Sequence, residues 1–185
     1  MKPINYFEII HKYIPPASFA YSVYTPHVAL VTMKALKIAR KLGLSREQQV
    51  FIEEAAMLHD IGIVKVKRYD PAATSDLPYI CHAPAGREML EQEGLLKHAL
   101  VAERHIGVGI SKEEIVTQQF PLPHRDLIPE TIEEKIISWA DLFFSKTPKK
   151  LWLEASLYEI EKKVALYGER HVHVFHEWLA LFGSD

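Results

Sequence analysis

The dipeptide His59-Asp60 constrains the fold of this chain more than any other feature. It lies in the run Met57-Leu58-His59-Asp60-Ile61-Gly62, at the end of a stretch whose apolar spacing predicts a helix. An unpaired carboxylate is costly to bury, so a core aspartate needs a cationic partner. A metal ion held by both side chains would be such a partner. We therefore expect His59 and Asp60 to be metal ligands in the protein core.

Helical periodicity places three more ligand-type residues on the apolar faces of other predicted helices: His27, His105 and Asp141. A lone core histidine is ordinarily a packed residue with satisfied hydrogen bonds. Asp141 is harder to explain, because no cationic residue lies three or four positions away on its own face. Imidazole and carboxylate ligands without thiolate suit iron, zinc, manganese or cobalt, and they argue against a structural zinc site.

The remaining sequence reads as helical nearly throughout, so we expect one all-α domain over residues 1–185. Thr25-Pro26 resembles a helix start, and Ser45 with Gln48 forms a capping-box pattern. Residues 63–80 read as an irregular connection, with a short strand at 63–67 as the weaker alternative. The expected helices cover about 4–13, 25–42, 45–62, 84–92, 95–106, 156–166 and 168–182, and two more begin near 111 and 131.

Composition limits the classes of partner. The chain has 185 residues, 48% of them hydrophobic and 25% charged, with a net charge of −2 and the single cysteine Cys81. These values indicate a globular protein without a disulfide framework, and there is no basic stripe for a nucleic-acid polymer. No apolar run approaches the roughly 20 residues of a membrane span. We expect a cytoplasmic protein with neither a nucleic-acid polymer nor a membrane as partner, and leave its oligomeric state open.

The set His27, His59-Asp60, His82, His105 and Asp141 resembles the ligand set of the HD superfamily of metal-dependent phosphohydrolases, and His59-Asp60-Ile61-Gly62 resembles its HDIG signature. The resemblance covers about residues 20–150, and residues 151–185 would add C-terminal helices. It implies an HD-domain-like helical bundle with a metal site in its core.

The resemblance also implies which residues bind metal. His27, His59, Asp60 and Asp141 would hold one divalent ion. His82 and His105, each 23 residues after the preceding histidine of the set, would hold a second ion. Asp60 would then bridge the two ions. The expected cofactor is a pair of transition-metal ions: iron, manganese, cobalt, zinc or nickel.

The activity that follows from the resemblance is hydrolysis of a small phosphorylated metabolite, most plausibly a nucleotide, by a metal-bound hydroxide that attacks phosphorus. Asp60 would be catalytic. Cations near the metals would neutralise phosphate charge: we expect Lys65 and Arg104 to be catalytic and substrate-binding, and Arg125 and Lys146 to be substrate-binding.

Two other functions stay open. The same ligand set is similar to that of mixed-valent diiron oxygenases of the superfamily, which cleave inositol or phosphonates. The phosphonate type places a tyrosine and a glutamate before the first histidine, and this chain has Tyr21 and Tyr24 there but no acidic residue from Ile9 to Pro26. A non-catalytic metal- or nucleotide-binding module is the other alternative. His171, His173 and His176 are expected on a surface helix.

Overall fold

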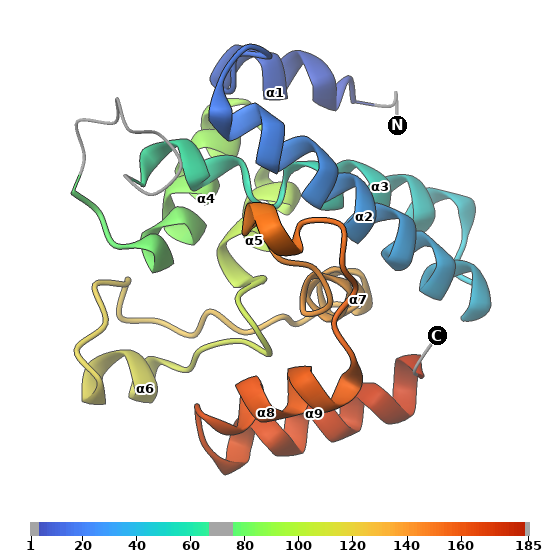
Figure 1. The fold of residues 1–185 in the computed structure, drawn as a ribbon, viewed down its shortest axis with the longest axis vertical. Coiled ribbons are helices and arrows are strands. Elements are labelled where there is room, and N and C mark those ends of the chain that lie inside the picture. Colours follow the sequence, from blue (N-terminus) through green and yellow to red (C-terminus); the bar gives the residue numbers. More distant parts are fainter. Residues whose placement is uncertain (1–3, 67–75, 184–185) are drawn as a thin grey trace.

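Helices make up almost all regular structure of the computed structural model, which describes residues 4–66 and 76–183 (Figure 1). The fold class expected from the sequence is confirmed. The α-helices in the described residues are α1 (Tyr6–Tyr13), α2 (Phe19–Lys41), α3 (Arg46–Leu58), α4 (His82–Gln92), α5 (Leu96–Arg104), α6 (Lys112–Thr117), α7 (Ile132–Asp141), α8 (Leu157–Ala165) and α9 (Glu169–Phe182). Three 3-10 helices join them: η1 (Ile61–Lys65), η2 (Tyr79–Cys81) and η3 (Pro148–Lys150).

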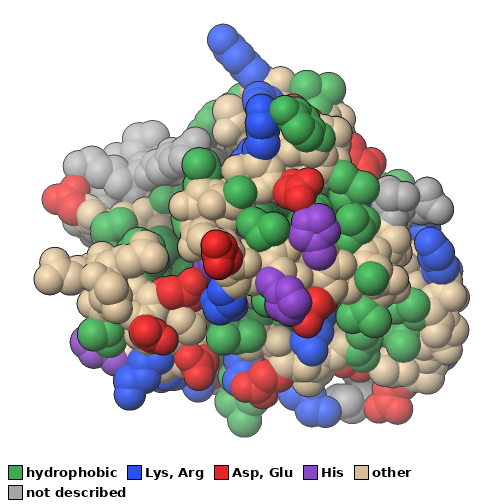
Figure 2. Space-filling view, turned by 90° about the horizontal axis from the view of Figure 1, so that it is seen from below, with side chains coloured by type: hydrophobic (Ala, Val, Ile, Leu, Met, Phe, Trp, Pro, Cys, Tyr) green, Lys and Arg blue, Asp and Glu red, His purple; other side chains and the backbone are tan. Residues whose placement is uncertain are grey.

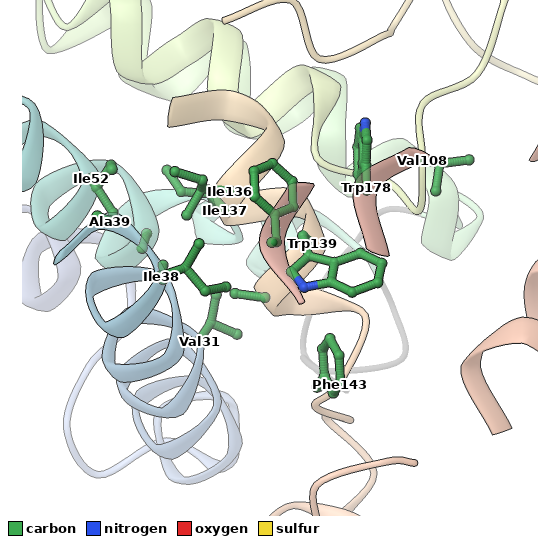
Figure 3. Close-up of a cluster of buried hydrophobic side chains, with 14 of the residues drawn as sticks. Val31, Ile38, Ala39, Ile52, Val108, Ile136, Ile137, Trp139, Phe143 and Trp178 are labelled. Atoms are coloured by element: carbon green, nitrogen blue, oxygen red, sulfur yellow. The ribbon is translucent and has the colours of Figure 1, made fainter. Parts of the chain in front are cut away.

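The larger apolar cluster packs around Trp139 of α7 (Figure 3). The indole centroid lies 5.4 Å from the ring of Phe143 and 5.3 Å from that of Phe175 on α9. Aliphatic side chains of α2 and α3, including Val31 and Ile52, close the other side. Because α8 and α9 contribute to this cluster, the C-terminal helices are packed onto the bundle core.

A second apolar cluster joins α1, the first half of α2, the end of α3, η1, α4 and α5. Tyr24 is fully buried in it and donates a hydrogen bond from its hydroxyl to the carbonyl oxygen of Met57, at 2.7 Å. On α2, His27 lies between Tyr24 of this cluster and Val31 of the larger one. The polar centre of the molecule therefore lies where the two apolar clusters meet.

Helix α2 begins earlier than the sequence predicts. It starts at Phe19, where Ser18 accepts a hydrogen bond from the backbone N–H of Tyr21, and it continues through Pro26. Proline costs a helix one backbone hydrogen bond. Burial of Ala20 and Val23 in the second apolar cluster favours the longer helix, so the expected start at Thr25 was wrong.

The chain turns sharply after α3, which ends at Leu58 rather than at Gly62. Residues 61–65 form η1, which rules out a strand over this stretch, while Lys67 and the rest of the expected connection up to residue 75 lie outside the described residues. Gly62 packs directly on Gly86 of α4. This close approach holds the His59-Asp60 turn against the start of α4.

No helix in residues 4–66 and 76–183 combines the length and the apolar character that crossing a membrane requires.

Candidate metal centre

Five of the six residues that the sequence singles out as ligands lie at the ends of helices. His27 is the exception, since it lies within α2. His59 follows α3, Asp60 precedes η1, His82 is the first residue of α4, His105 follows α5, and Asp141 is the last residue of α7. A helix end lets the chain change direction, so that side chains from different helices can converge on one point.

The two oxygens of the Asp60 carboxylate face two groups of ligands. Oδ2 lies 3.1 Å from Nε2 of His27 and 3.3 Å from Nε2 of His59. Oδ1 lies 3.2 Å from Nε2 of His82 and 3.4 Å from Nε2 of His105. We call His27, His59, Asp60 and Asp141 the four-ligand cluster, and Asp60, His82 and His105 the three-ligand cluster. Asp60 is therefore shared by both clusters.

Backbone carbonyl groups fix the orientation of three imidazoles. Nδ1 of His59 donates to the carbonyl oxygen of Ala56 at 2.7 Å, and Nδ1 of His105 donates to that of Ala102 at 2.8 Å. His82 makes the same bond to a carbonyl three residues earlier, that of Tyr79, at 2.5 Å. Each bond is donated by Nδ1–H and directs Nε2 of the ring at Asp60. Neutral imidazole in this tautomer is the form that binds a metal.

The buried polar atoms at the centre of the site indicate whether its residues suit a metal ion. Both oxygens of Asp60, Nε2 of His59 and Oδ1 of Asp141 lack a hydrogen bond of ordinary geometry within the described residues, although Oδ2 of Asp60 forms an ion pair with Lys146. Buried groups of this kind are rare in native structures. The donors are imidazole nitrogens and carboxylate oxygens, which suit divalent transition metals. The residues present therefore fit a divalent metal ion.

Charges at the site keep both carboxylates ionised. Burial acts to raise the pKa of Asp60, but Lys146 and His59 hold this pKa well below its ordinary value. The pKa of Asp141 is likewise held well below its ordinary value, with Lys146 as the main cause against burial. Ionised carboxylates are the form that a metal ion needs.

The buried histidines differ in protonation. Burial acts to lower the pKa of His59, but Asp60 and Asp141 raise it to about 9. The pKa of His105 is lowered to about 4, mainly by burial. A proton on His59 therefore balances carboxylate charge, and a divalent cation would displace it, whereas His105 already has a free lone pair.

A cleft of about 470 Å³ opens onto the metal centre. We call the part of the lining that His82, Asp141 and Lys146 form its polar end. The rest is mainly apolar, with Phe120 and Tyr167 among the aromatic rings, but it also includes Glu114, Lys163 and His171. The site is thus accessible from solvent on the side of the cleft, although five of its six ligand residues are buried.

The sequence interpretation missed Tyr79. Its ring stacks on the imidazole of His82, with centroids 4.5 Å apart, and it lines the cleft. The available signal was its position three residues before His82, but three-residue spacing before a helix start is too common to single out a tyrosine. Tyr79 supports the three-ligand cluster from the cleft side.

The four cations predicted to bind phosphate differ in their position relative to the cleft. Lys146 lines the cleft, and the described lining does not include Lys65, Arg104 or Arg125. Lys65 is exposed at the end of η1, and its role stays a prediction. Arg104 and Arg125 form ion pairs with Glu134 and Glu103, and their expected roles stay predictions. Both arginines have carboxylate partners on neighbouring segments that sequence spacing could not reveal.

The three C-terminal histidines differ in their exposure to solvent. His173 and His176 are exposed, as expected, on the face formed by α8 and α9, where Figure 2 shows histidine and charged side chains. His171 is buried instead, and its Nε2 lies 2.5 Å from Oε1 of Glu114 on α6. The expectation that His171 is a surface residue was wrong, because α6 packs over it.

The fold and the site define an HD-domain protein, and the comparison with family models agrees. The HD domain model matches residues 24–144, and the chain belongs to this family. The solved HD domain of the phosphodiesterase PgpH from L. monocytogenes, in complex with cyclic-di-AMP, has the same fold, with a TM-score of 0.55 over 97% of this chain and 96% of that chain. At 15% identity, this likeness concerns the fold alone.

Curated relatives match at higher identity. The tRNA (cytidine(56)-2'-O)-methyltransferase of Picrophilus torridus is 33% identical over 149 residues, which are 75% of this chain and 39% of the relative. The enzyme of the same name from Thermoplasma volcanium is 32% identical, over 86% of this chain and 43% of the relative. An uncharacterized protein of Methanocaldococcus jannaschii is 35% identical over 62% of this chain and 59% of its own length.

The chain spans about two fifths of the length of the two methyltransferases. Their names therefore do not assign methyl transfer to the shared segment. The same names leave the expected exclusion of a nucleic-acid polymer partner without support.

Proposed function

We propose that the protein is a metal-dependent phosphohydrolase that acts on a small phosphorylated metabolite, most plausibly a nucleotide. One observation carries the proposal: the two oxygens of Asp60 face separate ligand clusters, and one further ligand of each cluster, Asp141 and His82, lines the cleft. Carboxylate-bridged pairs of metal ions recur in enzymes that hydrolyse phosphate esters. HD-family membership supports the same chemistry.

Two divalent transition-metal ions, with iron, manganese and cobalt as the leading identities and zinc and nickel as further ones, are the proposed cofactor. When bound, such a pair supplies a hydroxide nucleophile at neutral pH and polarises a phosphoryl oxygen. The four-ligand cluster would hold one ion and the three-ligand cluster the other. Asp60 would be a ligand common to both ions, and the two apolar clusters surround the buried ligands.

The cleft supports a nucleotide as substrate. Its polar end, with Lys146 and the ligand residues, suits a phosphate group. Its apolar walls suit a nucleobase, and Phe120 and Tyr167 offer aromatic faces on which a base could stack. A volume of about 470 Å³ lies within the range of small-molecule sites.

The proposal is tested by phosphate release from a panel of phosphate esters, nucleotides and a tRNA, with Mn²⁺, Fe²⁺ or Co²⁺ supplied. We expect turnover by the native protein and its loss, by about a thousandfold or more, in His59→Ala and Asp60→Ala proteins that stay helical by circular dichroism. His173→Ala is the matched control, because that histidine is 77% exposed on α9. Undiminished turnover by folded Asp60→Ala protein would exclude the proposed role of the metal centre.

The oxygenase alternative uses the same ligand set. Tyr24, which precedes His27 on α2, donates a hydrogen bond from its hydroxyl group to the carbonyl oxygen of Met57. Oxygen uptake by iron-loaded protein on inositol or phosphonate substrates would establish that function. Tight nucleotide binding without any turnover would establish the non-catalytic module.

A further inference from the structure

Lys146 is a buried cation that lies against the four-ligand cluster. Its Nζ is 2.5 Å from Oδ2 of Asp60, 3.2 Å from Nε2 of His27 and 3.9 Å from Oδ1 of Asp141. Its side chain is only 7% exposed. Among the described residues, no ion pair or hydrogen bond joins Lys146 to His82 or His105. The ammonium group therefore contacts three residues of the four-ligand cluster, of which Asp60 is shared with the three-ligand cluster.

The contacts of Lys146 involve the atoms that would bind a metal ion. A divalent ion in the four-ligand cluster would bond Oδ2 of Asp60 and Oδ1 of Asp141. An ammonium group held against the same Asp60 oxygen would repel that ion, because two cations a few ångströms apart repel strongly where water is excluded. Metal and ammonium therefore compete for the same negative charge.

We infer that Lys146 competes with the metal ion for the four-ligand cluster, and that metal binding displaces its ammonium group into the adjoining cleft. The inference rests on the proposed metal site. Without metal, Lys146 neutralises Asp60 and Asp141 and stabilises the buried carboxylates. With metal, the divalent ion takes over that role.

The cleft offers space for the displaced ammonium group. Lys146 lines the cleft, as do its neighbours Ser145 and Thr147. A lysine side chain has four carbon–carbon torsions, so Nζ can move toward the cleft without a change of the backbone. There it would lie beside the position of a phosphoryl oxygen. Loading of the metal would thus prepare the binding of the phosphate.

Calorimetric titration of chelator-treated protein with Mn²⁺ tests the competition. Lys146→Met should lower the Mn²⁺ Kd of the four-ligand cluster by about tenfold or more, because one repelling charge is removed. The Kd of the three-ligand cluster should fall by less, because Lys146 contacts only Asp60 among the ligands of that cluster. Lys163→Met is the matched control: Lys163 lines the same cleft but is exposed, so its replacement should leave both Kd values unchanged.

Thermal unfolding gives a second measurement that does not depend on turnover. In chelator, Lys146→Met should melt at a lower temperature than the native protein, and Mn²⁺ should raise its Tm by more. Lys146→Arg keeps the charge and should bind Mn²⁺ like the native protein. If the Lys146→Met protein does not fold, Lys146→Gln takes its place as the uncharged variant.

Unchanged or weaker Mn²⁺ binding by a folded, uncharged Lys146 variant would overturn the inference. Absence of Mn²⁺ binding in every protein would overturn the proposed metal site as well. Failure to hydrolyse any phosphate ester, with the tenfold effect present, would overturn the proposed function and leave the inference in place.

Discussion

The carboxylate of Asp60 lies close to four histidines and to Lys146, which follows α7. The histidines are His27, His59, His82 and His105. Because its two oxygens face different clusters, a change at this residue affects both clusters at once. The other ligands each belong to one cluster. Asp60 is therefore the residue whose loss should abolish the site completely, whereas loss of His105 would leave the four-ligand cluster intact.

Arg104, which adjoins the ligand His105 in sequence, pairs with two glutamates in the folded protein. Nη1 lies 3.2 Å from Glu134 of α7, and Nη2 lies 3.1 Å from Glu130. We predict that Arg104→Ala lowers the free energy of unfolding by about 2 kcal/mol, because the buried Glu134 loses its cationic partner, with kcat within about twofold of native. Urea unfolding and steady-state kinetics measure the two effects.

Arg125→Ala serves as the comparison for this prediction. Arg125 is half-exposed, and its partner Glu103 also pairs with Arg87, so the loss of stability should be smaller. A loss of kcat in Arg104→Ala protein with unchanged stability would contradict this prediction and support the catalytic role expected from the sequence.

At the level of elements, the position of α4 depends on two glycines. A methyl group on Gly62 would overlap the carbonyl oxygen of His82 and the amide nitrogen of Gly86. We predict that Gly62→Ala costs about 3 kcal/mol of unfolding free energy and weakens Mn²⁺ binding, because α4 must shift and carries His82 with it. Chemical unfolding and metal titration measure these effects.

Gly86→Ala is the milder variant of the same contact. Its added methyl group would meet the amide nitrogen of Gly62 at 3.3 Å, which a small adjustment relieves. Equal stability and equal metal affinity for Gly62→Ala and the native protein would show that the close packing of η1 on α4 does not position His82.

Glu114 connects α6 to α9 and gives this contact a pH dependence. Burial acts to raise the pKa of Glu114, but hydrogen bonds from Ser111, Arg170 and His171 lower it to about 2. A carboxyl group with a lowered pKa in the folded state stabilises the protein above its ordinary pKa, and that stability is lost as the pH falls from about 4.5 toward 2.

Glu114→Gln should therefore be less stable than the native protein at pH 7, by about 1–2 kcal/mol, and the difference should disappear near pH 2–3. Urea unfolding at both pH values measures it. Glu159→Gln, which alters the exposed capping box of α8, should have a smaller effect at pH 7. A stability difference that is the same at pH 7 and pH 3 would contradict the proposed role of the Glu114 charge.

For the whole molecule, a metal ion should act as part of the core. The ligands come from α2, α3, α4, α5 and α7, so an ion bound to them would link most of the bundle. We predict that saturating Mn²⁺ raises the Tm of chelator-treated protein by about 5 °C or more, because binding to the folded state alone stabilises it. Differential scanning fluorimetry measures the shift.

Asp60→Ala protein should show no such shift, since both clusters lose a ligand. The same Tm for native protein with and without Mn²⁺ would mean that the buried carboxylates are stabilised fully by Lys146 and the histidines, and that the centre does not bind this metal.

Sequence periodicity predicted the helical class and the identity of the inward-facing polar residues. Both follow from local rules, because the 3.6-residue repeat places His27 and Asp141 on the apolar faces of their helices. This placement does not depend on how the helices pack. Helix boundaries were less predictable. The start of α2 at Phe19 has a local signal in the capping residue Ser18, but the burial of Ala20 and Val23 in the second apolar cluster depends on how the helices pack.

Charge partners were decided by the tertiary structure. Lys146 reaches Asp60 across 86 residues of sequence, and Arg104 reaches Glu134 across 30, so both pairs depend on how the helices pack. The sequence by itself determined which residue types could bind a metal, because ligand chemistry belongs to the side chain. Only the folded bundle decided which cation lies beside which carboxylate, because electrostatic interactions depend on distance and burial.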